Sequence, residues 1–215
     1  MAYANSQLSK ALDINTLTIG FARRAATYKR AQLIFKDVDR LIDIGKGKIQ
    51  IIFSGKAHPK DEGGKSLIKN IVKNSKYFTG HIKIIYLENY NMWLGRLITS
   101  GVDVWLNTPL RPNEASGTSG MKASLNGVPN LSVLDGWWSE GCIDGVNGWA
   151  VGNPNEISDE SDADHLYNLI ENNVIPSYYG DKDDWSTMMK ESIKTGISFT
   201  SHRMVTDYNN QYYKL

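Results

Sequence analysis

Glu114-Ala-Ser-Gly-Thr-Ser-Gly-Met-Lys-Ala-Ser-Leu-Asn126 is a run of small residues that leads directly into a helical pattern carrying Lys122. Glycine lets a backbone approach a ligand closely, and the free N–H groups at the start of a helix favour an anion such as a phosphate. A lysine one turn into that helix can add a point charge or form a Schiff base. The same residues also describe a Gly/Ser loop before a capped surface helix, and a glycine-rich loop alone does not decide between the two.

Short apolar runs alternate with helical patterns on both sides of this stretch. The runs are typical of buried parallel strands, and they cover residues 16–22, 48–54, 82–87, 102–106 and 128–133. Apolar residues recur at helical spacing over 33–42, 67–72 and 93–98, and Gly45 and Gly47 end the first of these helices. Strands separated by helices of this length predict an α/β fold, a Rossmann-like doubly wound parallel sheet with helices on both faces.

The composition is that of an ordinary globular domain. The chain has 215 residues, 41% hydrophobic and 22% charged, with a net charge of +1. That charge gives no bulk attraction to nucleic acid or to an anionic membrane. No apolar run approaches the ~20 residues of a membrane span, and the first residues lack the pattern of a signal peptide. We therefore expect a cytoplasmic protein that binds neither nucleic acid nor membrane.

We expect a single Rossmann-like domain over residues 1–215. Residues 1–16 are polar and predict a flexible N-terminal segment, and residues 153–164 are polar and acidic and predict a surface loop. Helices over 161–215 complete the chain. Cys142 is the single cysteine, which excludes an intramolecular disulfide, and we interpret it as a buried structural thiol.

In doubly wound sheets, ligands bind outside the carboxyl ends of the strands. This rule brings four segments to one edge of the sheet, namely 23–30, 55–61, 88–91 and 114–122. The first of them carries four cations, Arg23, Arg24, Lys29 and Arg30. Beside a glycine-rich helix start, these cations predict a phosphate or diphosphate site. The alternative is a solvated basic first helical turn, where the helix dipole makes basic residues unfavourable.

Glu114 can accept hydrogen bonds from sugar hydroxyls, while Ser116 and the Gly117 N–H can donate them. Glu114 can equally be a capping acid. Tyr90 can stack on an aromatic ligand or pack against a strand end, and the sequence does not choose between these roles. His58 is a candidate acid or base, although a loop histidine held by backbone hydrogen bonds is commoner.

The sequence predicts no metal site. The four histidines and the single cysteine lack the spacing of metal ligands. Residues 144–148 lack the alternating acids and the distal glutamate of a calcium loop.

Four segments resemble the α-glucan phosphorylases, which act on glycogen, starch and maltodextrin. EASGTSGMKASLNG is similar to the cofactor motif of that family, GFARRAATYKRAQL to its phosphate-binding segment, GKAHPKDEGGK to its glycine-lysine loop and IYLENYNMWL to its LENY segment. The similarity covers about 18–152 in the right order. The resemblance implies the C-terminal half of a GT-B fold. It also implies α-1,4-glucan phosphorolysis to glucose 1-phosphate with pyridoxal 5′-phosphate.

The resemblance implies roles for residues by their position. Lys122 would carry the cofactor as a Schiff base, and the cofactor phosphate would act as acid and base toward inorganic phosphate. Arg24 would hold the substrate phosphate, and Lys29, with Arg23 sharing its role, would bridge the two phosphates. The cofactor pocket would be completed by Gly117, Thr118, Ser119 and Tyr90. The glucose hydroxyls would be contacted by Tyr28, Glu114, Ser116 and Gly117.

The sequence departs from the family in three respects. Ser119-Gly120 stands where the animal enzymes have Gly-Asn, and Asn91 stands where they have an arginine beside the cofactor. The third departure is length, because the glucan cleft of the family belongs partly to an N-terminal domain. We therefore expect a missing N-terminal domain or a partner chain, no activity of this chain alone, and self-association into homo-oligomers through the exposed cleft face.

Two rival functions stay open at this point. The first is a nucleotide-sugar-dependent glucosyltransferase half-domain of the glycogen-synthase kind, which shares the fold and uses the same cations on a diphosphate. The second is a vestigial binding module without catalysis.

Overall fold

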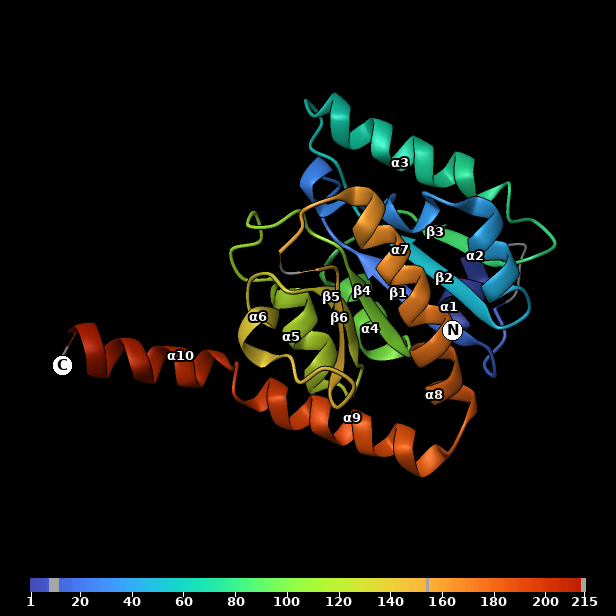
Figure 1. Cartoon of the computed structure of the whole chain (residues 1–215). Helices are drawn as coiled ribbons and strands as arrows, with labels where there is room; N and C mark the ends of the chain where they lie inside the picture. Colours follow the sequence, from blue (N-terminus) through green and yellow to red (C-terminus); the bar gives the residue numbers. More distant parts are fainter. Residues whose placement is uncertain (8–11, 154, 214–215) are drawn as a thin grey trace.

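The computed structural model describes residues 1–7, 12–153 and 155–213. Within these residues, six parallel strands form one sheet in the order β3-β2-β1-β4-β5-β6 (Figure 1). The strands are β1 Leu17–Ala22, β2 Ile49–Ser54, β3 Lys83–Leu87, β4 Val104–Asn107, β5 Asn130–Val133 and β6 Gly148–Val151. The strand order reverses between β1 and β4, which is the switch point of a doubly wound sheet. The predicted Rossmann-like fold is confirmed, and it is consistent with one half of a GT-B enzyme.

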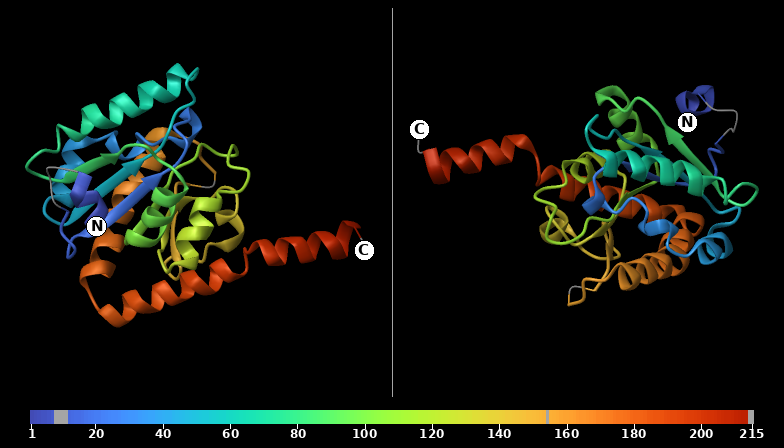
Figure 2. Two further views of the ribbon diagram at one scale, coloured as in Figure 1. Left: turned by 180° about the vertical axis from the view of Figure 1, so that it is seen from behind. Right: turned by 90° about the horizontal axis from the view of Figure 1, so that it is seen from above.

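Helices cover both faces of the sheet (Figures 1 and 2). The larger core contains side chains of α2 Val38–Gly45, α3 Glu62–Ser75, α7 Asp159–Leu169 and α8 Ile175–Tyr179. The smaller core, on the opposite face, contains side chains of α1 Ala2–Gln7, α4 Met92–Gly101 and α5 Thr118–Leu125. Successive strand residues alternate between the cores: Ile51 and Phe53 belong to the larger one and Ile52 to the smaller. All residues of β1 and β2 are buried, as continuous apolar runs predict.

The helix expected from Leu33 onward is divided in the structure. Two short 3₁₀ helices, η1 Thr27–Lys29 and η2 Leu33–Phe35, precede α2. Arg30 ends η1 in the left-handed conformation with φ 46°. The Asp37 side chain then accepts the N–H of Arg40 and caps α2. The prediction of one continuous helix was wrong because these local signals interrupt the apolar spacing.

Strand β6 was not predicted from the sequence. It has four residues and begins at Gly148, whose φ is 150°. A Cβ at Gly148 would lie 2.4 Å from the carbonyl oxygen of Asn130 in β5, so only glycine fits this approach. Trp149 and Val151 complete the larger core beside β5. A glycine-led run of this length gives almost no periodic signal.

Parts of the segment 1–16 pack against the body of the protein, and its flexibility stays a prediction. Residues 2–7 form α1, and Ala4 and Leu12 are buried in the smaller core. The Asn5 side chain accepts the Leu12 N–H at 2.6 Å and donates to the Leu12 carbonyl at 3.2 Å. Residues 8–11 lie outside the described residues. The organisation of 1–215 as one domain stays a prediction.

From Asp159 to Tyr213 the described residues are mostly helical. The π-helical turn η3 Ile170–Val174 joins α7 to α8, and α9 Lys182–Ile197 follows. Helix α10 Ser201–Tyr208 and the π-helical turn η4 Asn209–Tyr213 then project away from the body (Figures 1 and 2). None of the residues of α10 is buried. No helix in the described ranges combines the length and apolar character needed to cross a membrane.

Candidate functional site

The loops after β1 and β2 lie backbone to backbone at the carboxyl edge of the sheet. The Ala25 N–H donates to the Lys56 carbonyl at 3.0 Å. A Cβ at Gly55 would lie 2.2 Å from the Arg23 carbonyl oxygen, and one at Gly64 would lie 2.3 Å from the Ala25 carbonyl oxygen. Glycines at these positions therefore allow the approach that brings the basic segment against the next loop.

A buried cluster of two cations and one carboxylate forms at this edge. The Arg23 guanidinium and the Lys29 ammonium each lie 2.5 Å from Oε2 of Glu114, and the three side chains are 6% exposed. Arg23 also donates to Oδ1 of Asn107, the last residue of β4. The Lys29 ammonium lies 4.5 Å from the centroid of the Tyr28 ring, a favourable cation–π contact. The cluster joins segments that are about ninety positions apart in the chain.

The electrostatics of this cluster favour an anion. Burial by itself would raise the pKa of Glu114, but the hydrogen bond from Lys29 and the charge of Arg23 outweigh it, and the pKa lies below its ordinary value. Glu114 is therefore ionised at neutral pH and neutralises one of its two cations. One positive charge is left over in a buried setting, where it attracts anions more strongly than it would in water.

The segment after β5 holds the glycine turn in place. Gly117 has φ 84° and precedes α5. The Ser116 carbonyl accepts the Trp137 N–H at 2.8 Å, and the Glu114 N–H donates to the Asp135 carboxylate at 2.9 Å. A Cβ at Gly117 would lie 3.2 Å from the Trp137 ring. Contacts from Asp135 and Trp137 thus fix the glycine turn between Glu114 of the cation cluster and the start of α5.

Sequence reasoning missed Asn107, Asp135 and Trp137. Each of them ends a strand or follows one at the carboxyl edge, where the same rule that selected the other loops applies. Asp135 and Trp137 flank Gly136, and this Asp-Gly turn follows directly after the fifth predicted strand. The position of this turn, after a predicted strand, was the sequence signal that could have identified Asp135 and Trp137 as site residues.

The structure leaves Lys122 and Arg24 outside this hydrogen-bonded cluster. Both residues are exposed, and neither side chain bonds to another described residue. Lys122 lies one turn after Thr118, which is itself exposed, and Ser119 is half-buried. The glycine turn and the basic segment therefore meet through Glu114, while Lys122 extends from the same short helix.

Tyr90 is half-buried against α4. Its hydroxyl lies 3.0 Å from the position of a Cβ on Gly95. Burial raises the pKa of Tyr90, and the charge of Arg23 acts in the opposite direction. Tyr90 packs against α4 and the smaller core.

Arg30 does not belong to the cation cluster, although the sequence suggested that it did. Its guanidinium binds Asp159 at 2.8 Å and Asp162 at 2.6 Å, and it donates to the carbonyls of Thr108 and Pro109. The prediction of a surface loop over 153–164 was wrong in its second half, because α7 begins at Asp159. Asp162 is only 1% exposed, so α7 is held to the basic segment by a buried ion pair.

The surroundings of His58 and Cys142 favour structural roles over catalytic ones. Nδ1 of His58 accepts the Lys60 N–H at 3.1 Å, as expected of a loop histidine held by the backbone. Burial, with a smaller effect of the Asp144 charge, raises the pKa of the Cys142 thiol to about 12. The thiol is half-buried and protonated at neutral pH, so it is a poor nucleophile. The described residues contain no group of three or more histidine, cysteine or acidic side chains that could hold a metal ion.

A family model described as carbohydrate phosphorylase matches residues 2–140. The chain belongs to the carbohydrate phosphorylase family. It is 51% identical over 211 residues to a maltodextrin phosphorylase of Thermococcus litoralis, covering 94% of this chain and 25% of that protein. It is 49% identical to a glycogen phosphorylase of Aquifex aeolicus, covering 94% of this chain and 31% of that protein. A glycogen phosphorylase of Mycobacterium tuberculosis is 43% identical, with 96% and 25% covered. The chain thus spans about a quarter to a third of these relatives.

Gly120 and Asn91 both have structural roles in this phosphorylase-family chain. A Cβ at Gly120 would lie 2.6 Å from the Asn130 side-chain oxygen and 2.8 Å from the Trp137 indole nitrogen, so a larger residue would push α5 away. Asn91 accepts the Leu94 N–H and caps α4. Asn91 therefore has a structural role at the start of α4.

Proposed function

We propose that this chain is the cofactor-bearing C-terminal domain of an α-glucan phosphorylase. Such an enzyme transfers the terminal α-1,4-linked glucose to inorganic phosphate and releases glucose 1-phosphate. The observation that carries the proposal is the buried Arg23–Glu114–Lys29 cluster, with its surplus positive charge, beside the start of the helix that bears Lys122. The relatives named above are glycogen and maltodextrin phosphorylases, which supports a glucan as the substrate class.

The chemistry of these residues fits pyridoxal 5′-phosphate. We propose that the amine of Lys122 holds its aldehyde and that Gly117, Thr118 and Ser119 bind its phosphate. The left-handed Gly117 starts α5 without a side-chain cap from any described residue, so its first N–H groups are available to an anion. Tyr90 would line the same pocket beside Arg23. When bound, this cofactor supplies a phosphate group as acid and base next to the substrate phosphate.

The chain's own residues would then bind and orient the substrates. Arg24, exposed at the edge, would bind inorganic phosphate, and Lys29 and Arg23 would hold the charge that accumulates between two phosphates. Tyr28, Glu114, Ser116 and Gly117 would contact the glucose hydroxyls. Glu114 already accepts hydrogen bonds from Arg23 and Lys29. These bonds fix the orientation of its carboxylate, which could then accept a hydrogen bond from a sugar hydroxyl.

A further part of the enzyme would supply the rest of the glucan cleft. The alignment covers 94% of this chain but only 25% of the Thermococcus litoralis protein, which supports a missing N-terminal domain or partner chain. Helix α10 supports a missing part as well, because its apolar side chains Met204, Val205 and Tyr208 are 47%, 60% and 48% exposed and could pack against it.

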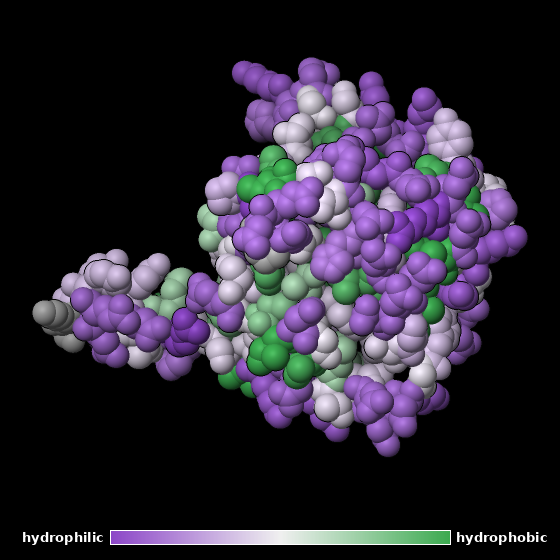
Figure 3. Space-filling view, viewed as in Figure 1, coloured by the Kyte–Doolittle hydropathy of each residue, from purple (hydrophilic) through white to green (hydrophobic). Residues whose placement is uncertain are grey.

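The face seen in Figure 3 is mostly hydrophilic, with hydrophobic residues in separate patches. Inactivity of the chain alone, homo-oligomers and a cytoplasmic location stay predictions.

A thermal unfolding experiment separates this proposal from the nucleotide-sugar rival. Pyridoxal phosphate at a hundred times its dissociation constant should stabilise the chain by about 2.7 kcal/mol. Pyridoxal, which lacks the phosphate, should stabilise it much less, and ADP-glucose or UDP-glucose should not stabilise it. Protection by a nucleotide sugar without protection by pyridoxal phosphate would support the glucosyltransferase. Protection by none of these ligands would support the vestigial module.

A further inference from the structure

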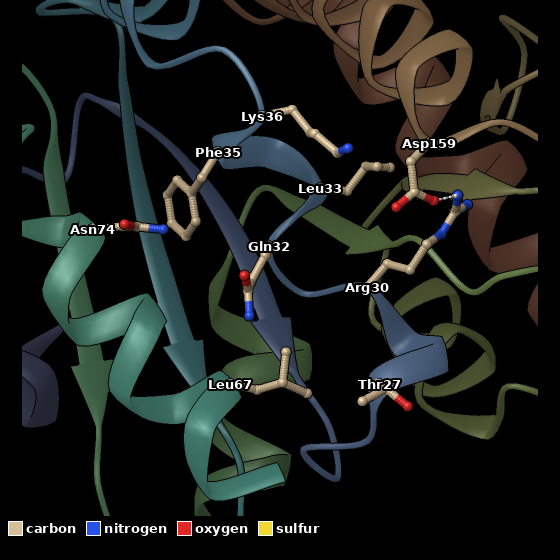
Figure 4. A pocket seen from close by; sticks show the side chains of 9 residues that line it. All are labelled: Thr27, Arg30, Gln32, Leu33, Phe35, Lys36, Leu67, Asn74 and Asp159. Atoms are coloured by element: carbon tan, nitrogen blue, oxygen red, sulfur yellow. Dashed lines mark hydrogen bonds and ion pairs between the residues drawn. The ribbon is translucent and has the colours of Figure 1, made fainter. Parts of the chain in front are cut away.

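A pocket beside the basic segment contains none of the residues of the glycine turn. Its volume is about 400 Å³, and it lies between the 27–36 segment, α3 and the start of α7 (Figure 4). It is lined by Thr27, Arg30, Gln32, Leu33, Phe35, Lys36, Leu67, Asn74 and Asp159. None of residues 114–122 belongs to this lining. The pocket therefore needs an explanation of its own.

The charges of this pocket are already matched within the protein. Arg30 binds Asp159 at 2.8 Å at one side of the pocket. Lys36 binds Glu160 at 2.7 Å at the rim. A phosphate or a cation entering here would compete with these pairs and would meet no surplus charge. The pocket differs in this respect from the Arg23–Glu114–Lys29 cluster.

The unengaged polar groups of the pocket are uncharged. The side chains of Thr27, Gln32 and Asn74 make no hydrogen bond to another residue in the described part of the chain. A hydroxyl or a carboxamide both donates and accepts hydrogen bonds, which matches the hydroxyl groups of a polyol. Two segments of the chain, 27–36 and α3, bring these groups around one space (Figure 4).

The pocket also has an apolar surface. Leu67 of α3 is half-buried and supplies accessible apolar surface, while the buried Leu33 and Phe35 form the base of the pocket (Figure 4). A few polar groups placed around an apolar wall are typical of small-molecule sites, whose volumes run from about 300 to 1,000 Å³. Sugar rings combine an apolar face with a rim of hydroxyls, and a volume of about 400 Å³ suits one or two of them.

We propose that this pocket is an oligosaccharide-binding site, separate from the cofactor site, that takes one or two neutral sugar units. Gln32 and Asn74 bind the hydroxyls, and Leu67 contacts the ring face. Binding here involves none of the residues assigned to phosphate or cofactor. It therefore does not depend on the proposed phosphorolysis.

The test uses the full chain and maltotriose, followed by NMR. The side-chain amide signals of Gln32 and Asn74 should shift on titration, and the double variant Gln32→Ala/Asn74→Ala should bind maltotriose at least about tenfold more weakly. Asn70→Ala is the matched control, because Asn70 is an exposed residue one turn earlier in α3, and it should bind like the wild type.

Three results would overturn the proposal. Maltotriose shifts confined to residues 114–122 would place the sugar at the cofactor edge instead. Unchanged affinity in the double variant, with thermal unfolding confirming that it is folded, would remove Gln32 and Asn74 from the site. If maltotriose does not bind at millimolar concentration, the pocket is not an oligosaccharide-binding site.

Discussion

Glu114→Gln is expected to lower the free energy of unfolding at neutral pH by about 3–5 kcal/mol, because it leaves two buried cations without their counter-ion. The Arg23 and Lys29 side chains are 6% exposed, so water cannot replace the carboxylate. The same variant should bind inorganic phosphate more tightly, because phosphate no longer competes with a carboxylate for these cations. Urea unfolding and calorimetric titration with phosphate measure the two effects.

The effect of Glu114 on stability should depend on pH. Its pKa lies below the ordinary value of 4.5, so the folded state gains stability from the ionised carboxylate above that pH and loses it as the pH falls through the folded pKa. The difference between wild type and Glu114→Gln should therefore be largest near neutral pH and shrink in acid.

Glu191→Gln is the matched control for this variant. Glu191 also lies 2.5 Å from a lysine, Lys194, but this pair is on the surface and should be worth no more than about 1 kcal/mol. Equal, small losses in both variants at every pH would contradict the role given to the cluster.

Arg30→Met is expected to cost about 3–5 kcal/mol of unfolding free energy, because it removes the partner of a buried carboxylate. Asp162 is 1% exposed, and its Oδ1 has no hydrogen-bond partner among the described residues, so Arg30 supplies its charge compensation through Oδ2. Two carbonyls, of Thr108 and Pro109, lose a donor as well. The total stability of a domain is about 5–15 kcal/mol, so this loss is a large fraction of it.

Arg40→Met provides the comparison for Arg30→Met. Arg40 of α2 pairs with Asp164 of α7, the helix that also carries Asp162, but the side chains of this pair are 28% and 63% exposed. We expect a loss of no more than about 1 kcal/mol. Chemical denaturation of both variants measures the difference, and a loss in Arg30→Met as small as that in Arg40→Met would mean that Asp162 is compensated in another way.

The sequence predicted the sheet because its central strands are buried on both faces and therefore appear as continuous apolar runs. It did not predict β6, where Gly148 permits an approach to Asn130 that only the folded sheet reveals. The 3₁₀ turns were not predicted either, because the apolar spacing from Leu33 onward is that of one helix unless Asp37 is identified as an N-cap.

The sequence indicated which residues lie at the candidate site, but it did not indicate which of them contact one another. Arg23, Lys29 and Glu114 were selected from strand ends and a glycine turn, and the structure brings them together. Their contact with one another was not foreseen, because a carboxylate between two cations depends on how loops ninety positions apart meet. Arg30 was assigned to the same cluster because its partner, Asp162, lies 132 positions away in an acidic stretch.

Borohydride reduction of the chain after incubation with pyridoxal phosphate tests the central claim most directly. Mass spectrometry of the digested protein should find a pyridoxyl group on Lys122, and the same treatment of Lys122→Ala should leave that peptide unmodified and add no group at another specific lysine. A wild-type Lys122 that stays unmodified under excess pyridoxal phosphate would contradict the assignment of this helix as the cofactor-bearing element.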